Sequence, residues 1–530
     1  MRETREVTIA AAPYRYLVIG SIFLIYTAVR FWGLNSSCLW FDEIFGVHAA
    51  EHSWGGMFRF VALDLIHPPL FYVLVKLWIG AGGESPEWLR FFSYSISILT
   101  VVPFLQLCRE LKLSHLTTAI AFLVFAVNGA LIKYAQEVRM YSLLLFLSTV
   151  SIWLFARFFY RGKNIWILSL VNVLLVYTHY YGWLLVLAEV VAILALQRIK
   201  IRDALVVASI ALVSYVPWIW AVWTASSAGA DARQNIGWIE RPGVRSLLDF
   251  VFDVIEPFYF QQSSAEPSTL VFITVPLLVL VIVAKASYLS RFRLAEDSNF
   301  TILSVLTAVP VFTALLLSWT LPYSVWGSRH LIIVFVPMTL LMGKIFSEFE
   351  NWILRSLLIY AILLILAASF VVRWRTPTTE KVWCAWEKLA DRFVSIPHYS
   401  SEPKTLYAFE DLVAYHVWFA LREAGNCQVI RVTGVEGLGE DRAYFLPRGF
   451  DDVAVVNISQ VKGNPIYIAF RTETPEEQSR LPFISPPPKQ PLLTFLNSGY
   501  SQERTEMIDV GGQSAYVVML IKDPTGNPMP

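Results

Sequence analysis

Long apolar segments recur along the first 372 residues and are separated by short polar connectors. A helix needs about 20 mostly apolar residues to cross the hydrocarbon core of a bilayer. By that measure the pattern predicts about eleven membrane-spanning helices. They are expected near residues 14–34, 88–108, 114–132, 140–159, 164–178, 181–197, 203–223, 268–286, 299–320, 329–346 and 353–372.

Lysine and arginine gather in every second connector, which sets the expected orientation. Cytoplasmic loops carry the excess of basic residues in membrane proteins, so we assign these connectors to the cytoplasm. The N-terminus is then cytoplasmic, and everything after the last span is extracytoplasmic. The first span lacks a small-residue cleavage site and is expected to remain as an uncleaved helix. The basic residues are Arg109, Lys112, Arg157, Arg161, Lys163, Arg198, Lys200, Arg202, Lys285, Arg291 and Arg293.

The apolar stretch 68–80 is short for a span. Counting it as one would reverse the side of every basic connector that follows. We therefore predict a re-entrant or juxtamembrane segment on the outer surface, within the first external loop. Irregular backbone at membrane depth is tolerated where it lines a cavity, so His67, Pro68 and Pro69 are expected to line one.

The composition changes after Arg373, where long polar stretches begin. We predict a transmembrane domain over residues 1–372 and an extracytoplasmic α/β domain over residues 373–530. Helices are expected at 382–394 and 412–423, the second with Asp411 as its N-cap. Strands are expected at 406–409, 428–432, 453–458, 465–470 and 514–521.

The composition supports the membrane class and excludes others. The 530 residues are 56% hydrophobic and 16% charged, which is typical of a polytopic membrane protein. A net charge of +1 gives no indication of a nucleic-acid partner. No glycine-rich phosphate loop occurs in a cytoplasmic connector, which argues against a nucleotide-driven pump. Of the four cysteines, Cys384 and Cys427 are expected to form a disulfide, because both lie in the extracytoplasmic domain.

Two adjacent acids, Asp42 and Glu43, follow Trp40-Phe41 in the first external loop. Ionisable groups beside a bilayer are costly and usually face a wet cavity where they serve function, although a solvated loop acid is the simpler alternative. The later external connectors also concentrate polar groups: residues 133–141 (Lys-Tyr-Ala-Gln-Glu-Val-Arg-Met-Tyr), 177–182 (Tyr-Thr-His-Tyr-Tyr-Gly) and 326–330 (Trp-Gly-Ser-Arg-His).

Structural explanations exist for two of these connectors. The tyrosines of 177–181 could form an interfacial aromatic belt. A single arginine such as Arg329 could extend its charge to the interface along the apolar surface. An external basic pair, Arg329 with His330, nevertheless runs against the positive-inside trend, which favours an anionic ligand.

Taken together, these motifs resemble the polyprenyl-phosphate-sugar-dependent glycosyltransferases of the GT-C fold. The similar members are the prokaryotic relatives of protein O-mannosyltransferase and of the lipid A aminoarabinose transferase. The resemblance covers roughly residues 14–346. It implies that Asp42 takes the place of the catalytic acid, and that Glu137 matches the acidic residue of the second external loop. The chain departs from eukaryotic protein O-mannosyltransferases in carrying an α/β tail and no β-trefoil domain.

The resemblance implies a lipid-linked sugar phosphate as donor and a protein, lipid or glycan hydroxyl as acceptor. Asp42 is expected to be the general base of an inverting transfer, while Glu43 orients it or holds the acceptor, and Glu137 does likewise or ligates a divalent cation. Candidate metal ligands are Asp42, His67 and Glu137. Candidates for the donor phosphate are His67, Lys133, Arg139, Arg329, His330 and Arg90. Candidates for the substrate cavity are Tyr72, Gln136, Tyr141, His179 and Tyr180.

Two other classes of protein would also explain many spans. A lipid or glycolipid transporter, or a flippase, would place its charges within discontinuous spans of two matching halves. A membrane-anchored sensor would not need so many helices or an acidic first loop. The clustering of acids and cations in external loops therefore favours a multi-pass transferase of the plasma (inner) membrane.

Overall fold

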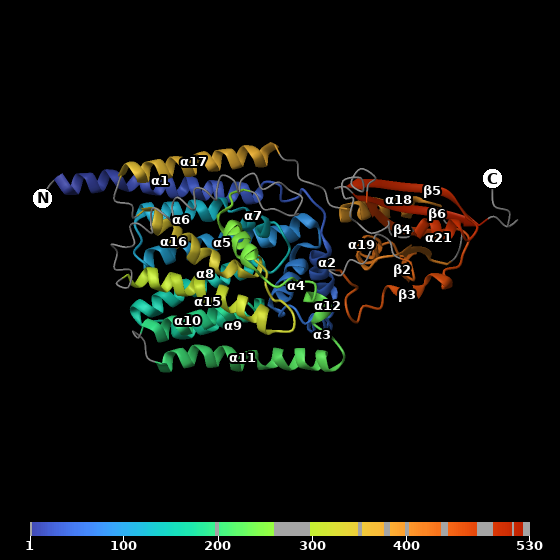
Figure 1. The fold of residues 1–530 in the computed structure, drawn as a ribbon, viewed down its shortest axis with the longest axis horizontal. Coiled ribbons are helices and arrows are strands. Elements are labelled where there is room, and N and C mark those ends of the chain that lie inside the picture. Colours follow the sequence, from blue (N-terminus) through green and yellow to red (C-terminus); the bar gives the residue numbers. More distant parts are fainter. Residues whose placement is uncertain are drawn as a thin grey trace. The chain divides into compact units, whose positions relative to one another are not determined.

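A computed structural model describes residues 3–196, 201–258, 297–347, 352–375, 382–397, 402–435, 444–473, 491–510 and 513–522. The chain divides into two compact units (Figure 1). The first unit comprises Met1–Leu34, Met57–Gly229 and Ile239–Pro377, and is helical. The second unit comprises Asn35–Gly56, Ala230–Trp238 and Thr378–Pro530, and contains the sheet.

The first unit is a bundle of long apolar helices. Six of the described helices are long and apolar enough to cross a membrane: Tyr14–Phe31, Pro86–Glu110, Tyr141–Arg161, Ile201–Ser227, Ser298–Thr320 and His330–Ser347. The span expected at 268–286 lies outside the described residues. The helices of this unit are α1 (Glu3–Phe31), α3 (Trp54–Asp64), α4 (Leu70–Gly82), α5 (Pro86–Glu110), α6 (His115–Val127), α7 (Gly129–Ala135), α8 (Tyr141–Arg161), α9 (Ile165–Thr178), α10 (Gly182–Leu196), α11 (Ile201–Ser227), α13 (Val244–Ile255), α15 (Ser298–Thr320), η2 (His330–Val334), α16 (Phe335–Ser347) and α17 (Trp352–Arg375).

The stretch 68–80 forms the short helix α4, which begins at Leu70 directly after Pro68 and Pro69. Its 13 residues span about 20 Å, less than the hydrocarbon thickness. The turn into α5 is fastened by two indoles: Trp78 and Trp88 stack at 4.5 Å, and each Nε1 donates to the other's carbonyl oxygen, at 2.8 and 2.9 Å. The helix length therefore agrees with a segment that does not cross the membrane.

The span expected at 114–132 is broken into α6 and α7 at Asn128. The Asn128 side chain caps α7 by accepting the N–H of Leu131 at 2.8 Å. The last carbonyls of α6 lose their helical partners at such a break. Arg30, which is fully buried, donates to the carbonyl oxygens of Ala126 at 2.6 Å and Phe125 at 3.3 Å. An intramembrane arginine thus stabilises an irregular backbone.

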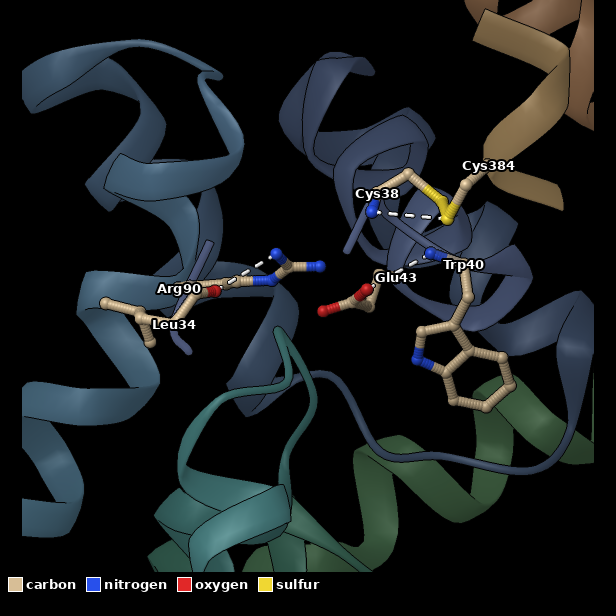
Figure 2. The surroundings of a disulfide bond; sticks show 6 residues. All are labelled: Leu34, Cys38, Trp40, Glu43, Arg90 and Cys384. Atoms are coloured by element: carbon tan, nitrogen blue, oxygen red, sulfur yellow. Dashed lines mark hydrogen bonds between the residues drawn. A yellow bond between two sulfur atoms is a disulfide. The ribbon is translucent and has the colours of Figure 1, made fainter. Parts of the chain in front are cut away.

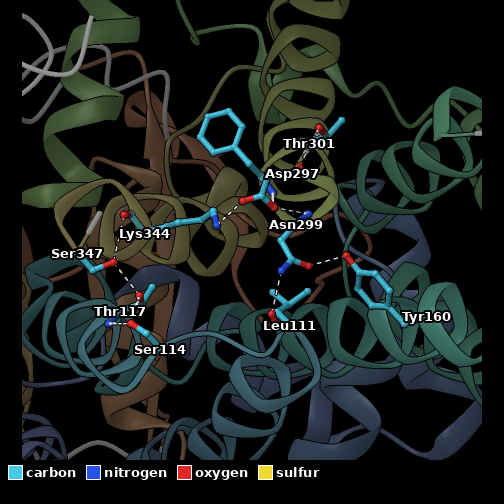
Figure 3. A network of polar contacts seen from close by, with 10 residues as sticks. Leu111, Ser114, Thr117, Tyr160, Asp297, Asn299, Thr301, Lys344 and Ser347 are labelled. Atoms are coloured by element: carbon cyan, nitrogen blue, oxygen red, sulfur yellow. Dashed lines mark hydrogen bonds and ion pairs between the residues drawn. The ribbon is translucent and has the colours of Figure 1, made fainter. Parts of the chain in front are cut away.

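A polar network joins the ends of α5, α6, α15 and α16 (Figure 3). The Asp297 carboxylate caps α15 by accepting the N–H groups of Asn299 and Phe300, at 3.0 and 3.2 Å. It also contacts Nζ of Lys344 on α16 at 2.5 Å. On the α6 side, the Thr117 hydroxyl lies 2.7 Å from that of Ser347. Asp297 therefore both begins one helix and holds a neighbouring one.

We expect Asp297→Ala to lower the free energy of unfolding by about 1–2 kcal/mol, the usual effect of losing an N-cap, with a further loss from the contact with Lys344. Asp297→Asn keeps a capping oxygen and should lose less. The measurement is thermal unfolding of the purified protein in detergent. Equal midpoints for the wild type and both variants would show that this network does not stabilise the fold.

The second unit contains a six-stranded mixed sheet with strand order β3-β2-β1-β4-β6-β5. Strands β3, β2, β1 and β4 run parallel, whereas β6 is antiparallel to β4 and to β5. Side chains of α18, including the fully buried Trp386, join the strands in one core. The elements are η3 (Val382–Cys384), α18 (Ala385–Ser395), β1 (Lys404–Ala408), α19 (Asp411–Leu421), β2 (Cys427–Thr433), β3 (Ala454–Asn457), η4 (Ile458–Gln460), β4 (Ile466–Glu473), α21 (Pro491–Leu496), β5 (Tyr500–Val510) and β6 (Gln513–Lys522).

Three details of this unit differ from the sequence prediction. The N-cap of α19 is Glu410, not Asp411, whose carboxylate instead binds Arg431 at 2.7 Å. Strand β5 was not predicted, because its sequence is mostly polar and it pairs on one side only, with β6. The expected pairing of Cys384 with Cys427 is wrong: Cys384 is bonded to Cys38, and Cys427 is a free thiol.

Candidate active site

The two acids of the first loop lie in the first turn of α2 (Phe41–Glu51), within the second unit. Glu43 is 1% exposed, and its Oε2 accepts the N–H of Trp40 at 3.1 Å, so it caps its own helix (Figure 2). Asp42 is more accessible than Glu43. Both acids therefore lie at a helix N-terminus, where the aligned peptide dipoles favour negative charge.

In the first unit, three histidines predicted as site residues lie together although they come from distant parts of the chain. The His179 ring centroid is 5.5 Å from that of His67 and 4.9 Å from that of His330. His67 precedes α4, His179 lies between α9 and α10, and His330 begins η2. Tyr181 adds a ring 5.1 Å from His330. Loops that are separate in the sequence thus form one cluster.

Two arginines add positive charge to this histidine cluster. Arg139 is 4% exposed, and Arg329 directly precedes His330. Burial, followed by the charges of His67 and Arg139, holds the pKa of His179 well below its usual range; Arg329 acts in the same direction. His179 is therefore neutral at pH 7, and Arg139 and Arg329 contribute positive charge to the cluster.

The tautomer of His179 follows from its backbone contact. Its Nδ1 lies 3.1 Å from the backbone nitrogen of Tyr181 and accepts that N–H. A neutral imidazole that accepts at one nitrogen carries its proton on the other. Nε2 is then a hydrogen-bond donor on a ring that also feels the charges of Arg139 and Arg329, and donors and cations of this kind suit an anionic oxygen. We name the set His67, Arg139, His179, Arg329 and His330 the basic cluster.

Residues 133–141 form a tight turn beside this cluster. Lys133 and Glu137 form an ion pair at 3.6 Å, and the N–H of Arg139 donates to the Glu137 carbonyl oxygen at 2.8 Å. The Tyr141 ring lies 6.3 Å from that of His330. The turn therefore fixes the backbone that carries Arg139.

The structure assigns other contacts to four of the predicted residues. Arg90 donates to the carbonyl oxygen of Leu34 at 3.1 Å, and Gln136 donates to the carbonyl oxygens of Arg30 and Trp32, at 2.9 and 2.7 Å. These contacts fasten the end of α1. Tyr72 is fully buried against Phe71, and the Tyr180 hydroxyl donates to the Leu65 carbonyl oxygen at 3.1 Å.

Sequence reasoning missed Asp253, which lies on α13. Burial, with the charge of Asp249, raises its pKa to about 6, against the lowering effects of a hydrogen bond from Ser328 and the charge of Lys133. Both of those partners belong to the predicted external connectors. The signal available in the sequence was the amphipathic pattern of 244–255, which predicts a surface helix with Asp253 beside its apolar face.

All three candidate metal ligands lie in the part of the chain that the structure describes. No three His, Cys, Asp or Glu side chains among those residues form a group that could hold a metal ion. Asp42 belongs to the second unit, whereas His67 and Glu137 belong to the first. His67 has Asp64 as a neighbour, with Nδ1 and Oδ2 3.7 Å apart.

The fold defines a class: a polytopic α-helical membrane protein of the GT-C type with a C-terminal α/β domain. The chain is similar in structure to ArnT from Cupriavidus metallidurans bound to undecaprenyl phosphate, with a TM-score of 0.53, 12% sequence identity and coverage of 96% of this chain and 98% of that chain. The apo form of the same enzyme gives a TM-score of 0.52, with 13% identity and the same coverage. Both matches extend over the helices and the C-terminal domain.

A further similar structure is an Archaeoglobus fulgidus oligosaccharyltransferase tethered to an acceptor peptide. Its TM-score is 0.44 and its identity 13%, with coverage of 76% of this chain and 63% of that chain. No family model matches the sequence, and no curated protein matches it. The similarity to these structures therefore concerns the fold.

Proposed function

We propose that the chain is a membrane glycosyltransferase that moves a sugar from a polyprenyl-phosphate donor to an acceptor hydroxyl on the extracytoplasmic side. The observation that carries the proposal is the basic cluster, in which arginines and histidines from four connectors meet in a fold otherwise built from apolar helices. The similar ArnT structure contains undecaprenyl phosphate, which supports a lipid phosphate as the ligand of such a cluster.

The chemistry follows from charge and proton balance. Asp42 takes the proton of the acceptor hydroxyl while the hydroxyl oxygen bonds to the anomeric carbon, and the bond from that carbon to the phosphate oxygen breaks. Attack opposite to the leaving group inverts the anomeric centre. Polyprenyl phosphate departs with the bonding electron pair, and Arg139 and Arg329 meet its charge, with Nε2–H of His179 as a further donor. Glu43 positions Asp42 by capping α2.

The proposal is tested by incubating the purified full-length protein with a labelled polyprenyl-phosphate sugar in detergent or in liposomes. A transferase releases polyprenyl phosphate and labels an acceptor. A transporter or flippase moves the intact donor between leaflets, and the ester bond to the sugar survives. A panel of donor sugars and acceptors then identifies the substrates. Failure to cleave any donor, together with donor translocation in liposomes, would exclude the transferase.

We also propose that the connector after α8 is cytoplasmic and that the C-terminal domain is extracytoplasmic. Gly162 adopts φ +64° as the C-cap of α8, so a cysteine there would be strained, and the exposed Lys163 is the better position. In intact cells expressing a Cys427→Ser background, Lys163→Cys should be shielded from an impermeant thiol reagent. Asn497→Cys, which is exposed in the C-terminal domain, should react. The opposite labelling pattern would reverse the orientation.

A further inference from the structure

The segment that carries Asp42 packs with the C-terminal domain. Residues Asn35–Gly56 belong to the same compact unit as Thr378–Pro530, although more than 300 residues separate them in the sequence. The first attachment is covalent: Cys38, three residues before α2, is disulfide-bonded to Cys384 at the end of η3 (Figure 2). The backbone N–H of Cys38 also points at the Cys384 sulfur, at 3.4 Å.

The second attachment is an aromatic contact along the middle of α2. Phe41 and His48 are seven residues apart and therefore share a helix face. Both meet Tyr415 of α19, with ring centroids 5.0 Å from Phe41 and 5.9 Å from His48. The Tyr415 hydroxyl lies 2.9 Å from Nδ1 of His48, and Trp418 packs on the same imidazole at 4.7 Å. Tyr415 is completely buried, so this contact is part of the core.

The third attachment holds the C-terminal end of α2. Glu51, the last residue of the helix, accepts a hydrogen bond from Nε of Arg422 at 3.3 Å. Beginning, middle and end of α2 are thus each fixed to α19 or to the residues flanking α18. A helix of 11 residues is too short to be stable in water by itself, so these contacts decide its position.

The C-terminal domain also holds a second connector of the transmembrane part. Arg448 donates to the carbonyl oxygen of Asp231 at 2.5 Å, to Oδ1 of Asn235 at 2.6 Å and to Oε1 of Gln234 at 3.2 Å. These residues lie in and beside α12 (Arg233–Ile236), in the connector after α11. Two external loops of the chain therefore fold as parts of the C-terminal unit.

We propose that the C-terminal α/β domain is the holder of the catalytic helix, with Tyr415 and the Cys38–Cys384 disulfide as positioning elements for Asp42. This inference rests on the proposed function for the role of Asp42, whereas the holding of α2 is independent of it. A misplacement of about 1 Å can reduce the rate of an oriented reaction 10²-fold. Reduction of the disulfide should therefore slow transfer while the donor still binds.

The experiment compares the full-length wild type before and after treatment with a phosphine reductant. We expect reduction to lower kcat by about tenfold or more while KM for the lipid donor changes less than about twofold, and reoxidation to restore the rate. Cys427→Ser removes the free thiol of the same domain and is the matched control, which should respond as the wild type does. Cys38→Ser/Cys384→Ser should be slow from the start and insensitive to the reductant.

Tyr415→Phe provides a variant that is expected to fold, because it keeps the ring and removes only the hydroxyl facing His48. Hydrogen exchange gives a readout that does not depend on activity: amides of 41–51 should exchange faster after reduction and in Tyr415→Phe, while those of α18 stay protected. Unchanged exchange in 41–51 under both conditions would contradict the proposal that the C-terminal domain holds α2 in position. If exchange rises but no preparation transfers sugar, the C-terminal domain does fix α2, and the glycosyltransferase proposal fails.

Discussion

Asp42→Asn is expected to abolish most sugar transfer while the protein folds and binds its donor normally. The amide has nearly the shape of the carboxylate but cannot take a proton from the acceptor hydroxyl. A positioned general base contributes about 10²- to 10⁴-fold, so kcat should fall by that factor with little change in KM. The measurement is release of polyprenyl phosphate by purified wild-type and variant protein under saturating donor.

Glu43→Gln is the matched comparison, because it makes the same chemical change one residue away. Its amide oxygen can still accept the N–H of Trp40, so α2 keeps its cap and activity should fall much less. Glu43→Ala removes the cap and should lower stability as well as rate. Near-normal transfer by a well-folded Asp42→Asn protein would remove Asp42 from the role of base.

Much of the helical unit could be predicted from sequence, because apolar runs of about 20 residues have few other uses. The break at Asn128 could not be predicted. It depends on Arg30, almost 100 residues earlier, and on the carbonyl oxygens of Asp253 and Val254, which accept from Nδ2 of Asn128 at 2.8 and 2.9 Å. Hydrogen bonds between residues so far apart in the chain leave no local pattern in the sequence.

The C-terminal unit shows a second limit of sequence reasoning. Buried strands such as β1 and β4 carry apolar residues and were predicted, whereas the polar edge strand β5 was not. The disulfide prediction failed because it assumed that the domain begins after the last span. Cys38 belongs to the same unit by folding, although every helix of the first unit after α1 lies between it and the domain in sequence.

The candidate site was predicted in part. Cations in the connectors that we predict to be external were recognisable because they oppose the positive-inside trend, and five of the predicted residues lie together as the basic cluster. Arg90 and Gln136 look alike in sequence but bind backbone carbonyls at the end of α1. The partner of an arginine or an amide is set by tertiary structure, so residue type alone did not separate phosphate candidates from residues that fasten the fold.

Replacing Arg139 or Arg329 by alanine is expected to lose about 2–4 kcal/mol of transition-state stabilisation, the usual effect of removing one charged or hydrogen-bonding contact to a developing anion. Lysine should recover only part of the rate, because an ammonium group restores attraction but not the planar fork that fits phosphate oxygens. The measurement is kcat/KM with one lipid donor for Arg→Ala, Arg→Lys and the double alanine variant.

Arg161→Ala is the matched control for these variants. Arg161 is exposed and binds Glu110 at 2.6 Å at the far end of α8 from Tyr141, so its removal should leave kcat/KM unchanged. If Arg139 and Arg329 act on the same leaving group, the double variant should lose less than the sum of the single losses, because the second arginine has little left to stabilise once the first is gone. Strict additivity would indicate two separate sites. Wild-type values for both single variants would move the phosphate to Lys133 and His67.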